Sequence, residues 1–297
     1  AFFIKYEFWS NFLHILKHRG VPTYSVSSIF RPDQVFFKWY GKGYAGVLKC
    51  FTRFFVQNEE SKLLIEGIGI KDVDVVGDTR FDRVLQIKEA AKDLPICEAF
   101  RKGKTSSVEA LPKDGYKVFV AGSSWPPDEE IFIRFFNEHK EWRLLIAPHV
   151  IGEEHLKFIL SKIEGKKVVR YTQTSPEEAA EADVLIIDCF GLLSSMYRYG
   201  DVAYVGGGFG VGIHNTLEAA VWNMPVIFGP NNKKFQEAQG LLKSQGGFEI
   251  NNYEEFETLM GKMMSDTSFL ESSGKKAGDF VASLSGATDK VLAKVEL

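Results

Sequence analysis

A glycine-rich stretch followed by polar residues is the segment of this sequence best suited to chemistry. Residues 206–212 contain five glycines, and His214, Asn215 and Glu218 come directly after them. We expect an apolar strand at residues 202–205 and a helix that Asn215 caps, with Glu218 at the capping-box position. The N–H groups of such a turn and the positive end of the helix dipole favour an anion. The stretch therefore predicts a phosphate site, in which Asn215 donates to an oxygen and Glu218 accepts from a ribose diol.

The glycine spacing matches neither of two common phosphate-binding motifs. It lacks the G-x-G-x-x-G of dinucleotide-binding turns, with an acidic residue about 20 positions on, and no Gly-Lys-Ser/Thr follows as in a P-loop. The alternative interpretation is a βα turn whose glycines only ease tight packing. The polar residues after the glycines favour the phosphate site.

Strands and helices are expected to alternate along the chain. The expected strands are residues 2–6, 21–26, 54–57, 71–76, 117–121, 143–147, 167–171, 184–187, 202–205 and 225–228. The expected helices are residues 11–18, one that starts at 58–60, 84–100 with an interruption at Pro95, 128–138 and 153–163. This order is typical of parallel sheets, whose ligands bind at the carboxyl ends of the strands. The fold class predicted is α/β, with two Rossmann-like doubly wound domains that face a cleft.

The breaker-rich residues 101–115 predict the domain boundary. We expect an incomplete N-terminal domain at residues 1–112 and a C-terminal domain at 113–297, with the last helix, about 277–297, packing back on the first. The sequence opens on Ala1-Phe2-Phe3-Ile4, without Met and inside an expected strand, so we expect that N-terminal sequence is missing. Glu7 follows that strand, where it suits either a site in the cleft or a carboxylate at a helix N-terminus.

Polar or glycine residues follow several strands of the second half. These are Gly122-Ser123-Ser124-Trp125, Ala147-Pro148-His149, residues 188–193 and Gly229-Pro230-Asn231. His149 suits contact with a base or a phosphate, although a lone loop histidine is more often solvated. Gly191 would let a flat ring approach the backbone. Their convergence on one edge, rather than any single loop, indicates a binding site.

Composition restricts the class of protein. The chain has 297 residues, 45% hydrophobic and 25% charged, which suits two globular domains. The net charge of −3 gives no reason to expect nucleic acid, and three widely spaced cysteines suggest neither a metal pair nor a disulfide framework. We see no signal peptide and no apolar run of the roughly 18 to 20 residues that span a bilayer. A reducing compartment fits best.

Basic and aromatic residues alternate in residues 30–55. Lys38, Trp39, Tyr40, Lys42 and Tyr44 are typical of this segment, which also holds many Phe. Such a surface suits a membrane interface or an anionic amphiphile. The commoner explanation, which we favour slightly, is a helical hairpin with a buried Phe-rich face.

The sequence resembles the 3-deoxy-D-manno-octulosonic acid (Kdo) transferase family, bacterial glycosyltransferases that add Kdo from CMP-Kdo to a lipid A precursor. The matching motifs, in the family's order, are Tyr6-Glu7-Phe8-Trp9, Val76 to Asp82, Ala121-Gly122-Ser123-Ser124, Ile146-Ala147-Pro148, Gly191-Leu192-Leu193, Val205-Gly206-Gly207, Gly212 to Ala220, Phe228-Gly229-Pro230 and Phe235-Gln236-Glu237-Ala238. The resemblance covers most of the chain, and the His-Asn-x-Leu-Glu segment is specific.

The resemblance implies a GT-B architecture and an inverting enzyme without a catalytic metal or other cofactor. It implies a place on the cytoplasmic face of the inner membrane of Gram-negative bacteria, in lipopolysaccharide biosynthesis. Carried over by motif, the residues that bind CMP are Pro148, His149, Gly191, Leu193, Gly207, Asn215 and Glu218. Glu7 matches an essential carboxylate on the acceptor side and is the catalytic residue that the chain itself supplies.

The chain also departs from the family's pattern. His149 stands where Arg is usual, which weakens a fixed positive charge near the phosphate. Lys5 replaces a common acidic residue, and Ser10 a common Pro. The family's general base is a Glu in an N-terminal segment that this sequence does not contain. The alternatives are another GT-B transferase that uses a UDP-sugar, and a non-catalytic sugar-nucleotide-binding module.

Overall fold

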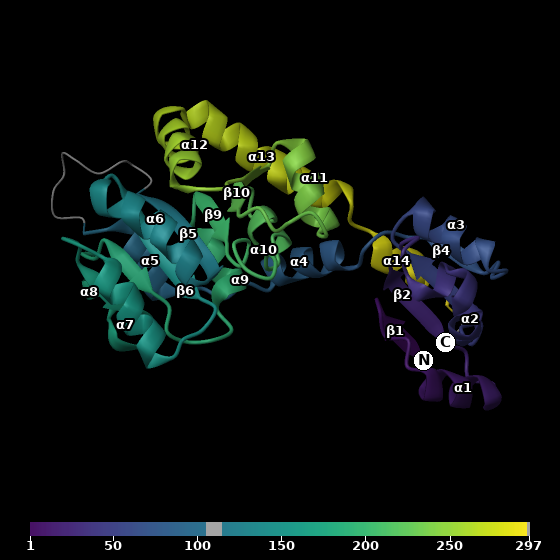
Figure 1. Cartoon of the computed structure of the whole chain (residues 1–297). Coiled ribbons are helices and arrows are strands. Elements are labelled where there is room, and N and C mark those ends of the chain that lie inside the picture. The colour runs from purple at the N-terminus through teal and green to yellow at the C-terminus, as the bar shows by residue number, and fades with distance from the viewer. Residues whose placement is uncertain (105–114, 296–297) are drawn as a thin grey trace. The chain divides into compact units, whose positions relative to one another are not determined.

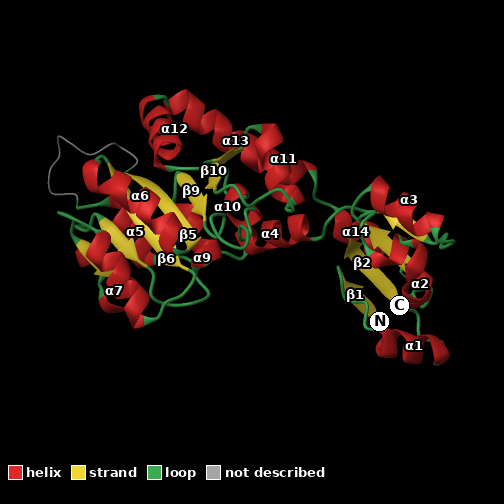
Figure 2. Cartoon of the chain, in the orientation of Figure 1, coloured by secondary structure: helices red, strands yellow, loops and turns green. Residues whose placement is uncertain are grey.

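The computed structural model describes residues 1–104 and 115–295. The chain forms two compact units, which we call unit 1 (residues 1–83 and 283–297) and unit 2 (residues 84–282). Each is a parallel sheet with helices packed around it, as Figures 1 and 2 show. The α/β class and the parallel sheets expected from the sequence are confirmed.

Unit 1 contains a four-stranded sheet in the order β1-β2-β3-β4. Its strands are β1 (Phe2–Ile4), β2 (Tyr24–Ser28), β3 (Arg53–Val56) and β4 (Val73–Val75). Its helices are α1 (Ser10–His18), α2 (Lys42–Leu48), α3 (Glu59–Gly67) and α14 (Ala287–Leu292), with single 3-10 turns η1 (Val35–Phe37) and η2 (Trp39–Gly41). The start of α3 follows from its cap, because the Asn58 side chain accepts from the Ser61 N–H at 2.9 Å.

Unit 2 contains a seven-stranded sheet in the order β11-β10-β9-β5-β6-β8-β7. Its strands are β5 (Lys117–Ser124), β6 (Trp142–Pro148), β7 (Val168–Arg170), β8 (Val184–Ile186), β9 (Val202–Val205), β10 (Val226–Phe228) and β11 (Gly247–Glu249). Its helices are α4 (Arg80–Glu89, which begins in unit 1), α5 (Pro95–Lys102), α6 (Pro126–Glu138), α7 (Glu153–Lys162), α8 (Pro176–Ala179), α9 (Leu193–Met196), α10 (Leu217–Ala220), α11 (Gln236–Ser244), α12 (Tyr253–Ser265) and α13 (Thr267–Ser283), with 3-10 turns η3 (Tyr171–Gln173) and η4 (Tyr197–Tyr199). None of the described helices is long and apolar enough to span a membrane.

The units divide at residue 83 rather than at the expected boundary. The expected position, 112/113, lies outside the described residues, whereas α4 and α5 already belong largely to unit 2. Contacts between distant segments hold them there. Lys88 Nζ donates to the Val221 carbonyl at 2.7 Å, and the Leu94 N–H donates to the Tyr199 hydroxyl at 2.8 Å. Residues 283–297 return to unit 1, where the Asp82 carboxylate accepts from the backbone of Thr288 at 2.7 Å.

Residues 30–55 do not form the helical hairpin that we favoured. They contain α2 and the turns η1 and η2, although the Phe side chains of this segment do lie in or against the core of unit 1. Phe30 and Phe54 are fully buried, with ring centroids 5.9 Å apart. The aromatic residues outside that core, Trp39, Tyr40 and Tyr44, are exposed.

The core of unit 2 gives a test of stability. Phe119 on β5 is fully buried, and its ring centroid lies 5.0 Å from that of Phe136 and 5.7 Å from that of Phe256. Phe119→Ala is expected to lower the free energy of unfolding of unit 2 by about 3–5 kcal/mol, because it leaves a cavity between α6 and α12. Urea unfolding measures this. Phe190→Ala, at a side chain 75% exposed, is the control and should cost less than about 0.5 kcal/mol; equal losses would contradict the prediction.

Candidate functional site

The loops that follow β5 and β9 lie at the point where the strand order of unit 2 reverses. From β5 the chain proceeds to β6 on one side, and from β9 it proceeds to β10 and β11 on the other. In open parallel sheets, ligands bind at the carboxyl ends of the strands at such a point. The segments in question are residues 122–125 at the end of β5 and 206–216 after β9, and the loop after β6 is their neighbour.

The glycine turn after β9 is packed closely against the loops of two neighbouring strands. A Cβ on Gly206 would lie 2.3 Å from the Ser123 carbonyl oxygen, and one on Gly208 would lie 2.6 Å from the backbone of Gly229. Both positions therefore require glycine for close packing. This agrees with the alternative interpretation, in which the glycines of a βα turn ease tight packing. The turn also uses several of its own N–H groups: those of Gly210 and Gly212 donate to the Gly207 carbonyl at 3.0 and 3.2 Å.

The helix after the turn differs from the one expected. The first residue of α10 is Leu217, its N-cap is Thr216 rather than Asn215, and it is a single turn that ends at Ala220. Asn223 with its positive φ and Pro225 prevent the helix from continuing. The predicted cap at Asn215 is therefore wrong, and a helix this short has only a small dipole.

Asn215 and Glu218 form a side-chain pair at this place. Asn215 Nδ2 donates to Glu218 Oε1 at 2.9 Å, and Asn215 Oδ1 accepts from the Leu217 N–H at 3.2 Å. These two contacts identify which atom of the amide is oxygen, because one partner can only accept and the other can only donate. Among the described residues, the second N–H of Asn215 has no hydrogen-bond partner, and both side chains are half-buried.

Three rings from three loops stack at the same edge of the sheet. The ring centroid of His149 lies 4.6 Å from Trp125 and 4.4 Å from His214. Trp125 Nε1–H also donates to His214 Nε2 at 3.2 Å. Nε2 must therefore be unprotonated, which assigns the proton of a neutral His214 to Nδ1. Burial lowers the pKa of His214, and the nearby His149 lowers it further, in agreement with a neutral ring.

The loop after β8 approaches the site through α9. A Cβ on Gly122 would lie 2.0 Å from the Tyr197 hydroxyl and 3.0 Å from Leu193 Cδ1. Burial raises the pKa of Tyr197, and the charge of Glu218 raises it further. Tyr197 was missed in the sequence, because a lone tyrosine carries no signal of its place beside β5.

The remaining sequence candidates differ in where they lie. Pro148 is buried at the end of β6, next to His149, and Gly207 is buried in the turn. Gly191 is exposed and has no atoms within 4 Å of an added Cβ. Glu7 is exposed in unit 1. Contacts therefore bring together the segments that carry His149, Leu193, Gly207, Asn215 and Glu218. The roles that the sequence assigns to the candidate residues stay predictions.

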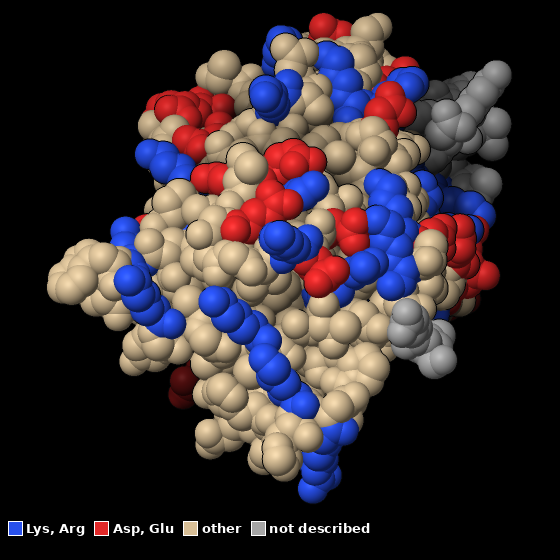
Figure 3. Space-filling model, turned by 90° about the vertical axis from the view of Figure 1, so that its right-hand side faces the viewer, with Lys and Arg blue, Asp and Glu red and all other residues tan. Residues whose placement is uncertain are grey.

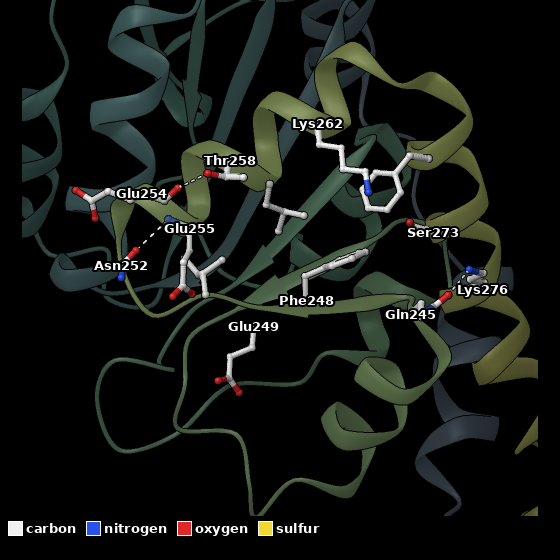
Figure 4. Close-up of a pocket in the computed structure, with 13 residues that line it drawn as sticks. Gln245, Phe248, Glu249, Asn252, Glu254, Glu255, Thr258, Lys262, Ser273 and Lys276 are labelled. Atoms are coloured by element: carbon white, nitrogen blue, oxygen red, sulfur yellow. Dashed lines mark hydrogen bonds between the residues drawn. The ribbon is translucent and has the colours of Figure 1, made fainter.

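Two pockets are relevant to the choice of site. One of about 250 Å³ lies beside the glycine turn, lined by Trp125, Phe209 and Val211 among others. A larger one of about 860 Å³ lies between β11, α12 and α13 (Figure 4). In that pocket Lys262 Nζ lies 3.8 Å from the ring centroid of Phe269, and Lys276 donates to Gln245 at 2.6 Å. The segments that follow β5, β6 and β9 do not line the larger pocket. We therefore do not regard it as the candidate site.

Comparison with known proteins gives the family. A family model described as 3-Deoxy-D-manno-octulosonic-acid transferase (kdotransferase) matches residues 1–83. A curated 3-deoxy-D-manno-octulosonic acid transferase from Aquifex aeolicus is 35% identical over 224 residues, which is 73% of this chain and 55% of the relative. One from Rickettsia felis is 26% identical over 230 residues, 76% of this chain and 47% of the relative. The chain spans about half the length of these relatives.

Solved structures support the fold. The UDP-GlcNAc 2-epimerase from Neisseria meningitidis, bound to UDP-GlcNAc, aligns with a TM-score of 0.59 and 12% identity, over 95% of this chain and 72% of that one. At this identity the likeness concerns the fold alone, and it agrees with the GT-B class predicted from the sequence. The sequence matches extend over both units. The chain is therefore a relative of the 3-deoxy-D-manno-octulosonic acid transferase family, as its motifs predict.

Proposed function

We propose that this chain is part of a glycosyltransferase that transfers Kdo from CMP-Kdo to a lipid A precursor in lipopolysaccharide biosynthesis. The observation that carries the proposal is the Asn215–Glu218 pair, held at the reversal point of the sheet beside the Trp125–His149–His214 rings. The curated relatives of this chain are named as 3-deoxy-D-manno-octulosonic acid transferases. Inversion at the anomeric carbon, without metal or other cofactor, is part of the proposal by resemblance.

The chemistry assigned to the site is loss of CMP from the sugar. The C–O bond to the phosphate breaks through an oxocarbenium-like state, and negative charge develops on the departing phosphate. The second N–H of Asn215 donates to that phosphate, and Glu218 accepts from the ribose hydroxyls. A donor that meets charge as it develops stabilises the transition state more than the ground state. Glu7 acts on the acceptor side.

Nucleotide binding tests the proposal, because both CMP and UDP are stable ligands. In calorimetric titrations of this chain, CMP should bind clearly more tightly than UDP. Tighter binding of UDP would favour the second candidate, a GT-B transferase that uses a UDP-sugar, since the glycine turn and a ribose-binding Glu suit either nucleotide. CMP binding would favour a sugar-nucleotide-binding module if single-turnover transfer stays absent when the segment with the family's general base is also supplied. Binding of neither nucleotide would contradict all three.

The proposal includes contact with the cytoplasmic face of the inner membrane through unit 1. Trp9, the N-cap of α1, and Phe12 and Ile15 of that helix are more than half exposed, as are Trp39 and Tyr40. Residues 10–50 contain six Lys and Arg but one Asp and no Glu. Figure 3 shows one face of the molecule, and in the lower half of that view Lys and Arg side chains lie among uncharged residues. Exposed aromatics with basic neighbours suit an anionic lipid surface.

Charge reversal tests this contact. Lys38→Glu with Lys42→Glu is expected to weaken binding to vesicles that contain anionic lipid at least about 30-fold, because each basic residue near such a surface contributes about 1 kcal/mol. Co-sedimentation with vesicles measures it. The control is Lys157→Glu with Lys243→Glu, two exposed positions of unit 2. Equal binding by both double variants would contradict the role of unit 1.

A further inference from the structure

The first turn of α6 carries two adjacent buried carboxylates that the proposed mechanism does not use. Asp128 is 1% exposed and Glu129 is fully buried. Burying a carboxylate is costly unless hydrogen bonds compensate it, and an apolar residue at such a position is often at least as stable. The two side chains therefore call for an explanation beyond the stability of the helix.

Asp128 connects α6 to the glycine turn. Its Oδ2 accepts from the Gly207 N–H and from the Trp125 N–H, both at 2.9 Å, and its Oδ1 accepts from the Tyr204 hydroxyl at 2.8 Å. All three partners are donors, which suits an ionised carboxylate. Burial raises the pKa of Asp128, while these hydrogen bonds oppose that effect. The contacts fix the start of the glycine turn relative to the loop after β5.

Glu129 connects the same helix to the loop after β6. Ser124 Oγ donates to Glu129 Oε1, and His155 Nε2 lies against Glu129 Oε2, both at 2.8 Å. The other nitrogen of His155, Nδ1, lies 2.8 Å from the Val150 carbonyl oxygen. Since a carbonyl only accepts, Nδ1 carries a proton, and a second proton lies between Nε2 and Glu129. Glu129 thereby holds Val150, the residue after His149, through His155.

We propose that Asp128 and Glu129 are positioning residues of the candidate nucleotide site, Asp128 for the glycine turn and Glu129, through His155, for the loop after β6. The inference rests on the proposed function. The two loops carry His214 and His149, whose ring centroids lie 4.4 Å apart, so displacement of either loop would separate the rings. One helix turn thus sets the relative place of the loops that meet the ligand.

Ala and amide variants of both positions test the proposal. Asp128→Ala and Glu129→Ala are each expected to weaken CMP binding at least tenfold at 10 °C, in protein shown to be folded. Asp128→Asn and Glu129→Gln should stay within about threefold of the parent. An amide can still present its oxygen to the donors, and its NH₂ to the Tyr204 oxygen or to a neutral His155. Glu130→Ala, at an exposed position on the same turn, is the control and should not change binding.

The Trp125 indole N–H signal gives a second measurement in the absence of ligand. In ¹H–¹⁵N spectra, assigned with Trp125→Phe, this signal should move in the two Ala variants and keep its place in the amide variants and the control. If an Ala variant does not fold, Tyr204→Phe, which removes one donor to Asp128, should still move the signal. Folded Ala variants with parental affinity and an unmoved signal would overturn the positioning role.

The two proposals fail in different ways. If the parent chain does not bind CMP, the proposed function fails, while the indole signal still reports on the position of the loops. If the parent binds CMP and folded Ala variants bind it equally well, the positioning role fails, while the proposed function stands. Residues that served stability alone would change the unfolding midpoint and leave the affinity of folded protein unchanged.

Discussion

Glu218→Ala is expected to weaken CMP binding by roughly 10- to 100-fold, because hydrogen bonds to a charged group contribute about 1.5–3 kcal/mol. In the structure the Glu218 carboxylate accepts from Asn215 Nδ2, which orients it, and it is half-buried at the edge of the sheet. A carboxylate can accept from both hydroxyls of a ribose diol. Calorimetric titration of the parent and the variant with CMP measures the effect.

The control experiments separate the ribose from the base. CMP and UDP share the ribose, so Glu218→Ala should weaken binding of both by a similar factor and leave their ratio unchanged. Glu218→Gln keeps one acceptor oxygen and should lie between parent and Ala. Glu154→Ala, at an exposed position on α7, should bind as the parent does. If Glu218→Ala retains parental affinity for CMP, Glu218 does not hold the ribose.

The strands of unit 2 other than β11 could be predicted from the sequence because they are locally encoded, whereas β11 (Gly247–Glu249) was not expected. Val202–Val205 is an uninterrupted apolar run between a polar residue and glycines, and its observed bounds agree with the expected ones. The start of α3 followed similarly from Asn58 and the acidic residues after it. In both cases the determining residues lie within a few positions of the element itself.

Features that depend on distant segments could not be predicted. α4 and α5 pack in unit 2 because Lys88 and Leu94 form hydrogen bonds with residues more than 100 positions away. Asp128 was expected only as the start of a helix, since its burial arises where β9 brings Tyr204 and Gly207 beside β5. The N-cap of α10 is Thr216 rather than Asn215, and sequence propensity does not decide between adjacent residues as caps.

Asn215→Ala is expected to lower the turnover number for Kdo transfer by about 10²–10³-fold, the usual effect of removing one donor to developing negative charge. The affinity for CMP should fall less than for Glu218→Ala, because the donor acts most strongly when the phosphate departs. Single-turnover transfer, in protein that also carries the family's general base, and CMP titration together measure the two quantities. Equal losses of turnover and affinity in both variants would contradict this division of roles.

Asn215→Asp tests whether the amide acts as a donor. The variant keeps the size of the side chain and the acceptor for the Leu217 N–H, but it places a second carboxylate against Glu218 at the position of a 2.9 Å hydrogen bond. Like charges at this distance repel, and the variant presents an acceptor to the departing phosphate. Asn215→Asp should therefore lose more turnover than Asn215→Ala. If the acid is instead the more active of the two, Asn215 serves to fix the start of α10 through Leu217, and the donor to the phosphate has to be another group of the turn.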